Sequence, residues 1–366
     1  PEKTKAGGTA GGSAGGAAVV RAEASKSLAL PDSQGQTQAF ADVRDLKLSA
    51  ESSPRDEALM RTLWFSSSTI FSGASAKIAE RVLEAGRNPG LGLRSLHAEG
   101  VTGEGVLVGI IDQNLPGTDH PEYSGKVVKY RDFGTGAGSG AGSMHGPAVL
   151  SLLVGDRAGA APGARVYYAA APSWSGDAKY YAQALDWMVE ESAKLPRGKG
   201  IKAVSVSAAP SGSGSPFSRN GSDWDRAVER AASRGILVLD CTTENGRINP
   251  CFYDPADPED PAKCIPGWPD LPWSFSASKL LAPTSYRSFA QAYSAGSSAW
   301  QYTGKGGLSW GIPWAAGVLA MGWQLDPALK ADAIMKLLGD SAYVSPEGAR
   351  IIDPRSFIEA VRRGGH

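Results

Sequence analysis

Short, continuously apolar runs alternate with helical patterns along the chain from about Asn88 onward. The apolar runs are Val106–Ile111, Ala164–Ala170, Ile201–Ser207 and Gly235–Leu239, and the helical patterns are Pro147–Val154, Ala178–Ala193, Ser222–Ser233, Trp310–Gln324 and Pro327–Leu338. A strand that is apolar along its whole length is buried on both faces, as strands of parallel sheets are. The alternation therefore predicts an α/β fold with a mainly parallel central sheet flanked by helices on both sides.

The first 87 residues have a different character. Residues 1–20 consist mostly of Gly, Ala, Ser and Thr, which predicts a flexible tail. Residues 21–87 form an extension with a helical pattern over Ser75–Ala85 and a short strand pattern over Thr62–Phe65. We expect this extension to remain attached and to pack on the main domain, residues 88–366, rather than to act as a removable propeptide.

The charge balance narrows the range of partners. Lys and Arg together number 37, and so do Asp and Glu, which gives a formal net charge of zero. Binding to nucleic acid or to an anionic membrane surface usually requires a basic excess, so neither partner is expected. No apolar run approaches the roughly 20 residues that a membrane-spanning helix needs, and no such segment is expected.

The cysteines and one acidic loop each leave two alternatives. Cys251 and Cys264 flank a loop rich in Pro and Asp and either form a disulfide or remain thiols, with Cys241 as the third cysteine. The loop Asp254–Asp260 carries carboxylates that suit a hard cation such as Ca²⁺. Its prolines and irregular spacing match no calcium loop, so a solvated acidic loop is favoured and no metal site is assigned.

Three residues stand where chemistry is expected. Asp112 ends an apolar strand, His145 follows the glycine-rich residues 134–142 and precedes Gly146, and Ser309 follows two glycines and begins a helix. Each has an ordinary structural explanation: a loop aspartate, a hydrogen-bonded histidine and a helix N-cap serine. Their order along the chain, Asp then His then Ser, is nevertheless the order of the subtilisin triad. The separations are 33 and 164 residues, which suit a compact subtilisin-like domain.

Three motifs resemble those of the subtilisin-like serine peptidases, the subtilases. Gly105–Asp112 resembles the strand that ends in the catalytic aspartate, Ser143–Gly146 with Val149 resembles the His-Gly motif, and Gly307–Pro313 resembles the Gly-x-Ser-x-x-x-Pro motif. The resemblance covers about residues 88 to 340. It implies a subtilisin-like three-layer sandwich in which Asp112, His145 and Ser309 form the catalytic triad.

Two further segments extend the resemblance. Gly159–Ala164 resembles the turn that follows the histidine helix of subtilases, and Ala203–Ser207 resembles their substrate-binding strand. The second segment implies that substrate is bound by Ser205, Ser207, Ala208 and Ala209. The family also places an oxyanion-binding asparagine shortly after the strand Gly235–Leu239. Asn245 is the candidate, although an ungapped match puts Glu244 at that position, and the Ser309 backbone N–H acting with another donor is the alternative.

Several residues depart from the family pattern and indicate a divergent branch. Gln113-Asn114 replaces the usual Ser/Thr-Gly after the aspartate, and Pro147 replaces the usual Ser or Thr after His-Gly. Leu308 and Trp310 flank the serine where most subtilases have Thr and a smaller residue. These departures leave all three triad residues in place.

The resemblance implies a serine endopeptidase that hydrolyses protein or peptide substrates through an acyl-enzyme and needs no cofactor for the chemistry. A catalytically inactive subtilase-like protein with a binding or regulatory role is the alternative. An esterase is disfavoured because its usual Gly-x-Ser-x-Gly elbow is absent around Ser309. The tail composition and the possible Cys251–Cys264 bridge favour an extracellular or cell-surface location, with the cytoplasm as the alternative.

Overall fold

The computed structural model describes the chain apart from residues 1–36, 137–142, 244–245, 293–295, 297 and 365–366. The predicted tail and the first part of the extension therefore lie outside the described residues. The centre of the molecule is a five-stranded sheet in the order β3–β4–β2–β5–β6, and every pair of neighbours is parallel. Its strands are β2 (Leu107–Asp112), β3 (Val127–Asp132), β4 (Arg165–Ala170), β5 (Ile201–Val206) and β6 (Leu237–Leu239).

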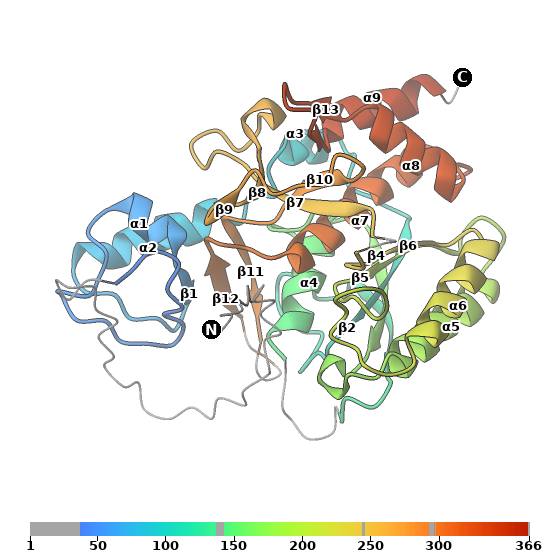
Figure 1. Cartoon of the computed structure of the whole chain (residues 1–366), viewed down its shortest axis with the longest axis horizontal. Helices are drawn as coiled ribbons and strands as arrows, with labels where there is room; N and C mark the ends of the chain where they lie inside the picture. Colours follow the sequence, from blue (N-terminus) through green and yellow to red (C-terminus); the bar gives the residue numbers. More distant parts are fainter. Residues whose placement is uncertain (1–36, 137–142, 244–245, 293–295, 297, 365–366) are drawn as a thin grey trace, which may run out of the picture.

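Helices cover both faces of this sheet (Figure 1). One face carries α4 (His145–Val154) and α7 (Leu308–Leu325), and the other carries α5 (Lys179–Ala193) and α6 (Gly221–Ser233). The predicted three-layer α/β architecture is confirmed, and four of the predicted helical patterns match these helices to within two residues. The arrangement places the carboxyl ends of the parallel strands at one edge of the sheet.

Strand β2 shows why a continuous apolar run is required at the centre. Val108 and Ile110 belong to the core packed against α4 and α7, whereas Ile111 belongs to the core packed against α5 and α6. Successive side chains of a strand point to opposite faces, so both sets of positions must be apolar when both faces are covered. Position 109 requires glycine, because a Cβ there would lie 2.4 Å from the Met188 sulfur of α5.

A second, six-stranded sheet has the order β13–β14–β10–β7–β8–β9. Its strands are β7 (Ile248–Phe252), β8 (Ile265–Trp268), β9 (Leu271–Pro272), β10 (Leu280–Pro283), β13 (Tyr343–Val344) and β14 (Arg350–Ile351). The remaining helices of the main domain are α3 (Leu93–Ala98), α8 (Ala331–Asp340) and α9 (Pro354–Gly364). Helix α8 begins four residues after the predicted start at Pro327, because Asp326 holds the intervening residues in a turn through bonds to Ala328 and Leu329.

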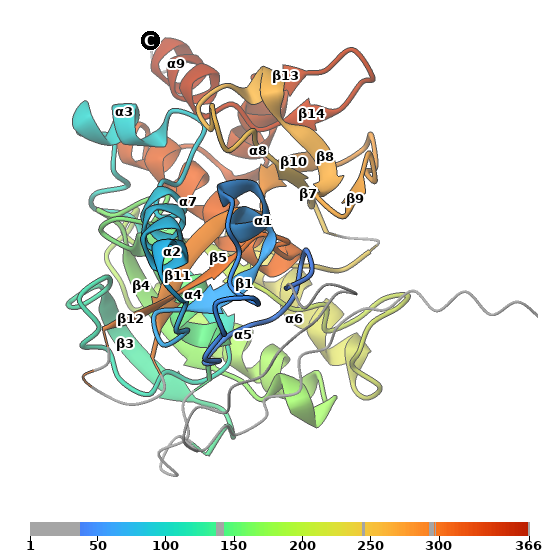
Figure 2. The same cartoon turned by 90° about the vertical axis from the view of Figure 1, so that its left-hand side faces the viewer.

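The extension contains α1 (Glu57–Thr62), β1 (Trp64–Ser66) and α2 (Ala74–Ala85). Strand β1 pairs antiparallel with β12 (Ala299–Thr303), which also pairs with β11 (Arg287–Gln291). Figures 1 and 2 show α1, α2 and β1 beside these two strands. The described part of the extension thus completes a sheet whose other strands belong to the main domain.

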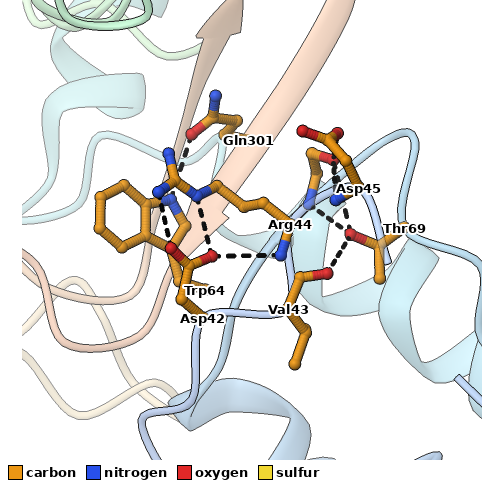
Figure 3. A network of polar contacts seen from close by, with 8 residues as sticks. Asp42, Val43, Arg44, Asp45, Trp64, Thr69 and Gln301 are labelled. Atoms are coloured by element: carbon orange, nitrogen blue, oxygen red, sulfur yellow. Dashed lines mark hydrogen bonds and ion pairs between the residues drawn. The ribbon is translucent and has the colours of Figure 1, made fainter. Parts of the chain in front are cut away.

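Polar contacts reinforce this junction (Figure 3). The Trp64 indole N–H donates to the Gln301 side-chain oxygen of β12 at 3.1 Å. The Arg44 guanidinium lies 3.7 Å from the centre of the Trp64 ring and forms an ion pair with Asp42. A guanidinium over an indole face is a favourable cation–π contact, so Arg44 and Asp42 hold the Trp64 ring within the extension while its N–H binds Gln301 of β12.

The structure bears on the state of the cysteines and on the expected absence of a membrane-spanning segment. Cys241, Cys251 and Cys264 are free cysteines, and the last two are buried. Within the described residues, no helix is long and apolar enough to cross a membrane.

We predict that Phe65→Ala loosens the extension. Phe65 is 1% exposed and packs against Phe71 and Tyr302, with ring centroids 5.4 and 5.1 Å away. Removing a buried ring of this size should lower the free energy of unfolding by about 3–5 kcal/mol. Urea denaturation measures this loss, and limited proteolysis should cut residues 37–87 faster. The control is Ile70→Ala, since Ile70 is 49% exposed; equal effects of both variants would contradict the packing.

Candidate active site

The carboxylate of Asp112 and the imidazole of His145 meet at the carboxyl edge of the central sheet. Asp112 ends β2 and is 2% exposed, and its Oδ1 accepts a hydrogen bond from His145 Nδ1 at 2.6 Å. His145 is the first residue of α4, and its side chain is 22% exposed. A buried carboxylate therefore fixes Nδ1, and the imidazole stays accessible from solvent.

A single glycine makes this meeting possible. A Cβ at Gly146 would lie 2.6 Å from the Gln113 carbonyl oxygen and 2.6 Å from the Tyr168 hydroxyl. These distances are far below van der Waals contact, so the first turn of α4 can approach the end of β2 only with glycine at this position. The close approach brings His145 into hydrogen-bond range of Asp112.

Gln113, which departs from the family pattern, connects three loops. Its side-chain oxygen accepts a hydrogen bond from the Ser143 hydroxyl, and Ser143 in turn accepts from the backbone N–H of His145 at 3.1 Å. Its side-chain N–H donates to the Ser173 hydroxyl at 2.8 Å. Gln113 thus braces the loop before His145 against the segment after β4. No local pattern could predict this role of Gln113, because its partners lie 30 and 60 residues away along the chain.

Ser309 lies in the first turn of α7 beside β5. Pro313 has no N–H, so it cannot donate to the Ser309 carbonyl four residues earlier as other helical residues would. The Ser207 hydroxyl donates to that carbonyl instead, at 2.8 Å. The Ser309 hydroxyl lies 3.4 Å from the Ser207 carbonyl oxygen. This reciprocal pair fixes the start of α7 against the carboxyl end of β5.

The residue after Ser309 brings α7 into contact with the histidine. The rings of Trp310 and His145 have centroids 5.1 Å apart. Among the described contacts, no hydrogen bond joins His145 to Ser309, whose hydroxyl is directed to Ser207. The structure therefore brings the three predicted triad residues to one edge of the sheet and joins Asp112 to His145 directly.

The other predicted site residues have different surroundings. Asn245 and Glu244 lie outside the described residues. Ser205 is 1% exposed, and its buried hydroxyl has no hydrogen-bond partner within the described part of the chain. The carbonyl oxygens of Ala208 and Ala209 already accept hydrogen bonds from the Cys241 backbone N–H and the Ser215 hydroxyl. Substrate binding by these residues, and by Ser207, stays a prediction.

The acidic loop makes contacts within the protein. Asp254 and Asp260 accept hydrogen bonds from the backbone N–H groups of Ala256 and Ala262. Asp257 forms an ion pair with Lys263 at 2.6 Å. Within the described residues, no group of three or more His, Cys, Asp or Glu side chains is arranged to hold a metal ion.

Electrostatics at the edge raise the pKa of His145. Burial disfavours the imidazolium, but the charge of Asp112 and its hydrogen bond outweigh burial and raise the pKa of His145 above its usual value. The neighbouring Tyr168 hydroxyl stays neutral, because burial and the Asp112 charge raise its pKa. Asp112 therefore stabilises the form of His145 that a general base becomes after it has accepted a proton.

We predict that Ser207→Ala destabilises the protein more than Ser205→Ala. The first change leaves the Ser309 carbonyl without its donor, which should cost about 1–3 kcal/mol in the free energy of unfolding. The second removes a buried hydroxyl without a partner and should be nearly neutral. Chemical denaturation of both variants makes the comparison. A neutral Ser207→Ala would show that another donor satisfies the carbonyl.

Asp112→Asn should lower the pKa of His145. The substitution removes the negative charge that favours the imidazolium, so the pKa should fall by about 1 to 3 pH units. Titration of the histidine ring protons by NMR measures the change without any need for activity, and a His145→Gln spectrum assigns the signal. An unchanged pKa would mean that the carboxylate does not act on the imidazole.

No protein-family model matches the chain, and no curated protein matches its sequence. Solved structures do match its fold. A chain of the subtilase cytotoxin SubAB assembly matches with a TM-score of 0.59 and 15% identity, covering 75% of this chain and 96% of that chain. The prenylagaramide maturation protease PagA matches with a TM-score of 0.52 and 18% identity, covering 74% and 98%. A Pseudoalteromonas arctica protease matches with a TM-score of 0.53 and 15% identity, covering 75% and 95%. The chain thus has a subtilisin-like fold.

Proposed function

We propose that the chain is a serine endopeptidase that hydrolyses peptide bonds through Asp112, His145 and Ser309. The observation that carries this proposal is the convergence of three elements on one imidazole. Strand β2 supplies the carboxylate that accepts from Nδ1, α4 supplies the ring, and α7 brings Trp310, the residue after Ser309, into contact with that ring. The neighbours of known fold include proteases, which supports the same chemistry.

In this mechanism His145 accepts the hydroxyl proton of Ser309 at Nε2 while Ser309 Oγ attacks the carbonyl carbon of the scissile bond. The imidazolium then gives that proton to the leaving amine as the C–N bond breaks, which leaves an acyl ester on Ser309. Water attacks the ester, with His145 again accepting and returning a proton, and the acid product leaves. Asp112 stays ionised and holds the ring in the useful tautomer.

The negative oxygen of the tetrahedral intermediate needs hydrogen-bond donors. The backbone N–H of Ser309 is suited to this, because N–H groups in the first turn of a helix have no intrahelical acceptor. Asn245 is our candidate for a side-chain donor. Removing one such donor lowers kcat by about 10²- to 10³-fold.

Protein or peptide substrates would bind in an extended form along the end of β5, where Ala208 and Ala209 follow the strand. The carbonyl oxygens of both residues are engaged, so an extended peptide would rely on their N–H groups. The protein would act outside the cell or at its surface, a location supported by the composition of residues 1–20.

A catalytically inactive binding protein is the second candidate. The direction of the Ser309 hydroxyl, toward Ser207 rather than His145, is the observation that favours it. Hydrogen bonds between catalytic groups are often long or poorly aligned in free enzymes and tighten when substrate binds. The peptidase proposal is therefore the stronger one.

Covalent labelling by a fluorophosphonate probe tests the proposal. The wild-type protein should be labelled, Ser309→Ala should not, and His145→Gln should label at least about 10²-fold more slowly because the serine loses its general base. The control is Ser211→Ala, which removes a serine hydroxyl that donates to Asp225 rather than to a triad residue, and should label normally. Folded wild-type protein that fails to label would favour the inactive binding protein.

A further inference from the structure

Three aromatic rings form a stack at the candidate site. Trp310 contacts both His145 and Phe289, with ring centroids 5.1 Å and 4.7 Å away. The two interplanar angles are 35° and 31°, so both neighbouring rings are tilted against the indole and neither is perpendicular to it. The rings come from α4, α7 and β11, which makes the stack a tertiary feature.

The indole has little freedom to move. Trp310 is 5% exposed and Phe289 is fully buried. The Trp310 backbone is fixed by the first turn of α7, where its N–H donates to the Gly307 carbonyl at 2.9 Å. The indole that contacts His145 is therefore rigidly held.

His145 is thus restrained from two directions. The hydrogen bond to Asp112 fixes Nδ1 and limits rotation within the ring plane. The Trp310 ring, which packs against the imidazole, limits movement of the imidazole out of that plane. Together the two contacts fix the direction in which Nε2 points, which a general base requires.

The indole face also acts electrostatically on the imidazole. The π face of a tryptophan carries partial negative charge and attracts a cation within about 6 Å of the ring centroid. Asp112 on β2 is the charged side chain that contacts the imidazole among the described residues. Tyr168 on β4 and Cys241 after β6 also lie near Asp112, and burial raises the pKa of both, so they remain neutral.

We propose that Trp310 is a positioning residue for His145: its indole face holds the imidazole in its working orientation and stabilises the imidazolium by a cation–π contact. This role in turnover rests on the proposed function, whereas the contact with the imidazole does not. The residue that appears in the sequence as a departure from the subtilase pattern is thereby part of the triad's support.

The test compares Trp310→Met with Trp310→Phe. Methionine removes the aromatic face, so the pKa of His145, measured by NMR titration of its ring protons, should fall by about 0.5 to 1 pH unit. Phenylalanine keeps a face and should lower the pKa by less than half as much. Trp323→Met is the matched control, because it also removes a buried indole from α7, but at its far end; this variant should leave the pKa unchanged.

The activity profile supplies an independent readout. The acid limb of kcat/KM reports deprotonation of His145, so in Trp310→Met it should move to lower pH by the same amount as the NMR pKa. The plateau should fall about two- to tenfold, because the imidazolium formed during attack is less stabilised. If Trp310→Met lowers the pKa of His145 but the wild-type protein hydrolyses no peptide, the Trp310–His145 contact is supported and the peptidase proposal is rejected.

A second measurement covers the case in which Trp310→Met does not fold. Fluorinated tryptophans placed at position 310 keep the shape of the indole while they reduce the negative charge of its face. The pKa of His145 should decrease stepwise with the number of fluorine atoms. A pKa that is the same with every analogue, and in Trp310→Met where it folds, would overturn the proposal.

Discussion

The close approach of α4 to the end of β2 is the constraint on which the candidate site depends. Only a residue without a side chain fits at Gly146, where the Gln113 carbonyl and the Tyr168 hydroxyl occupy the space that a Cβ would need. This contact sets the distance between Asp112 and His145, since both residues are adjacent to it in sequence. The central sheet fixes one side of the contact, and the burial of α4 beneath α7 fixes the other.

The central fold could be predicted because its physical cause is local. A strand covered on both faces must be apolar over most of its length, and β2, β4, β5 and β6 carry that signal in their own residues. Strand β3 escaped prediction because it lies at the sheet edge and none of its residues is buried, so polar residues such as Lys129 and Arg131 interrupt its pattern. The second sheet escaped because its strands span only two to five residues each.

The candidate site was predictable in a different way. Asp112, His145 and Ser309 were found through motifs whose order and spacing resemble the subtilases, and the structure places all three at one edge. The residues that support them were not predictable. The Ser207 hydroxyl donates to the Ser309 carbonyl, which lacks its usual helical donor because Pro313 has no N–H. Both of these residues lie more than 100 positions after Ser207 in the sequence. Gln113 braces loops that meet only after folding. Such roles arise from tertiary contacts, which a single sequence does not encode in any local pattern.

The extension and the nucleophile are connected through one continuous segment. Strand β12 pairs with β1 of the extension on one side and β11 on the other, and its last residue, Thr303, lies six positions before Ser309. The backbone N–H of Gly304 donates to the Leu63 carbonyl at 2.9 Å, which carries the pairing toward the nucleophile. Beyond β12, β11 also supplies Phe289, which packs behind Trp310. The same sheet therefore supports both the approach to Ser309 and the ring that faces His145, so removal of the extension would weaken the site from two sides.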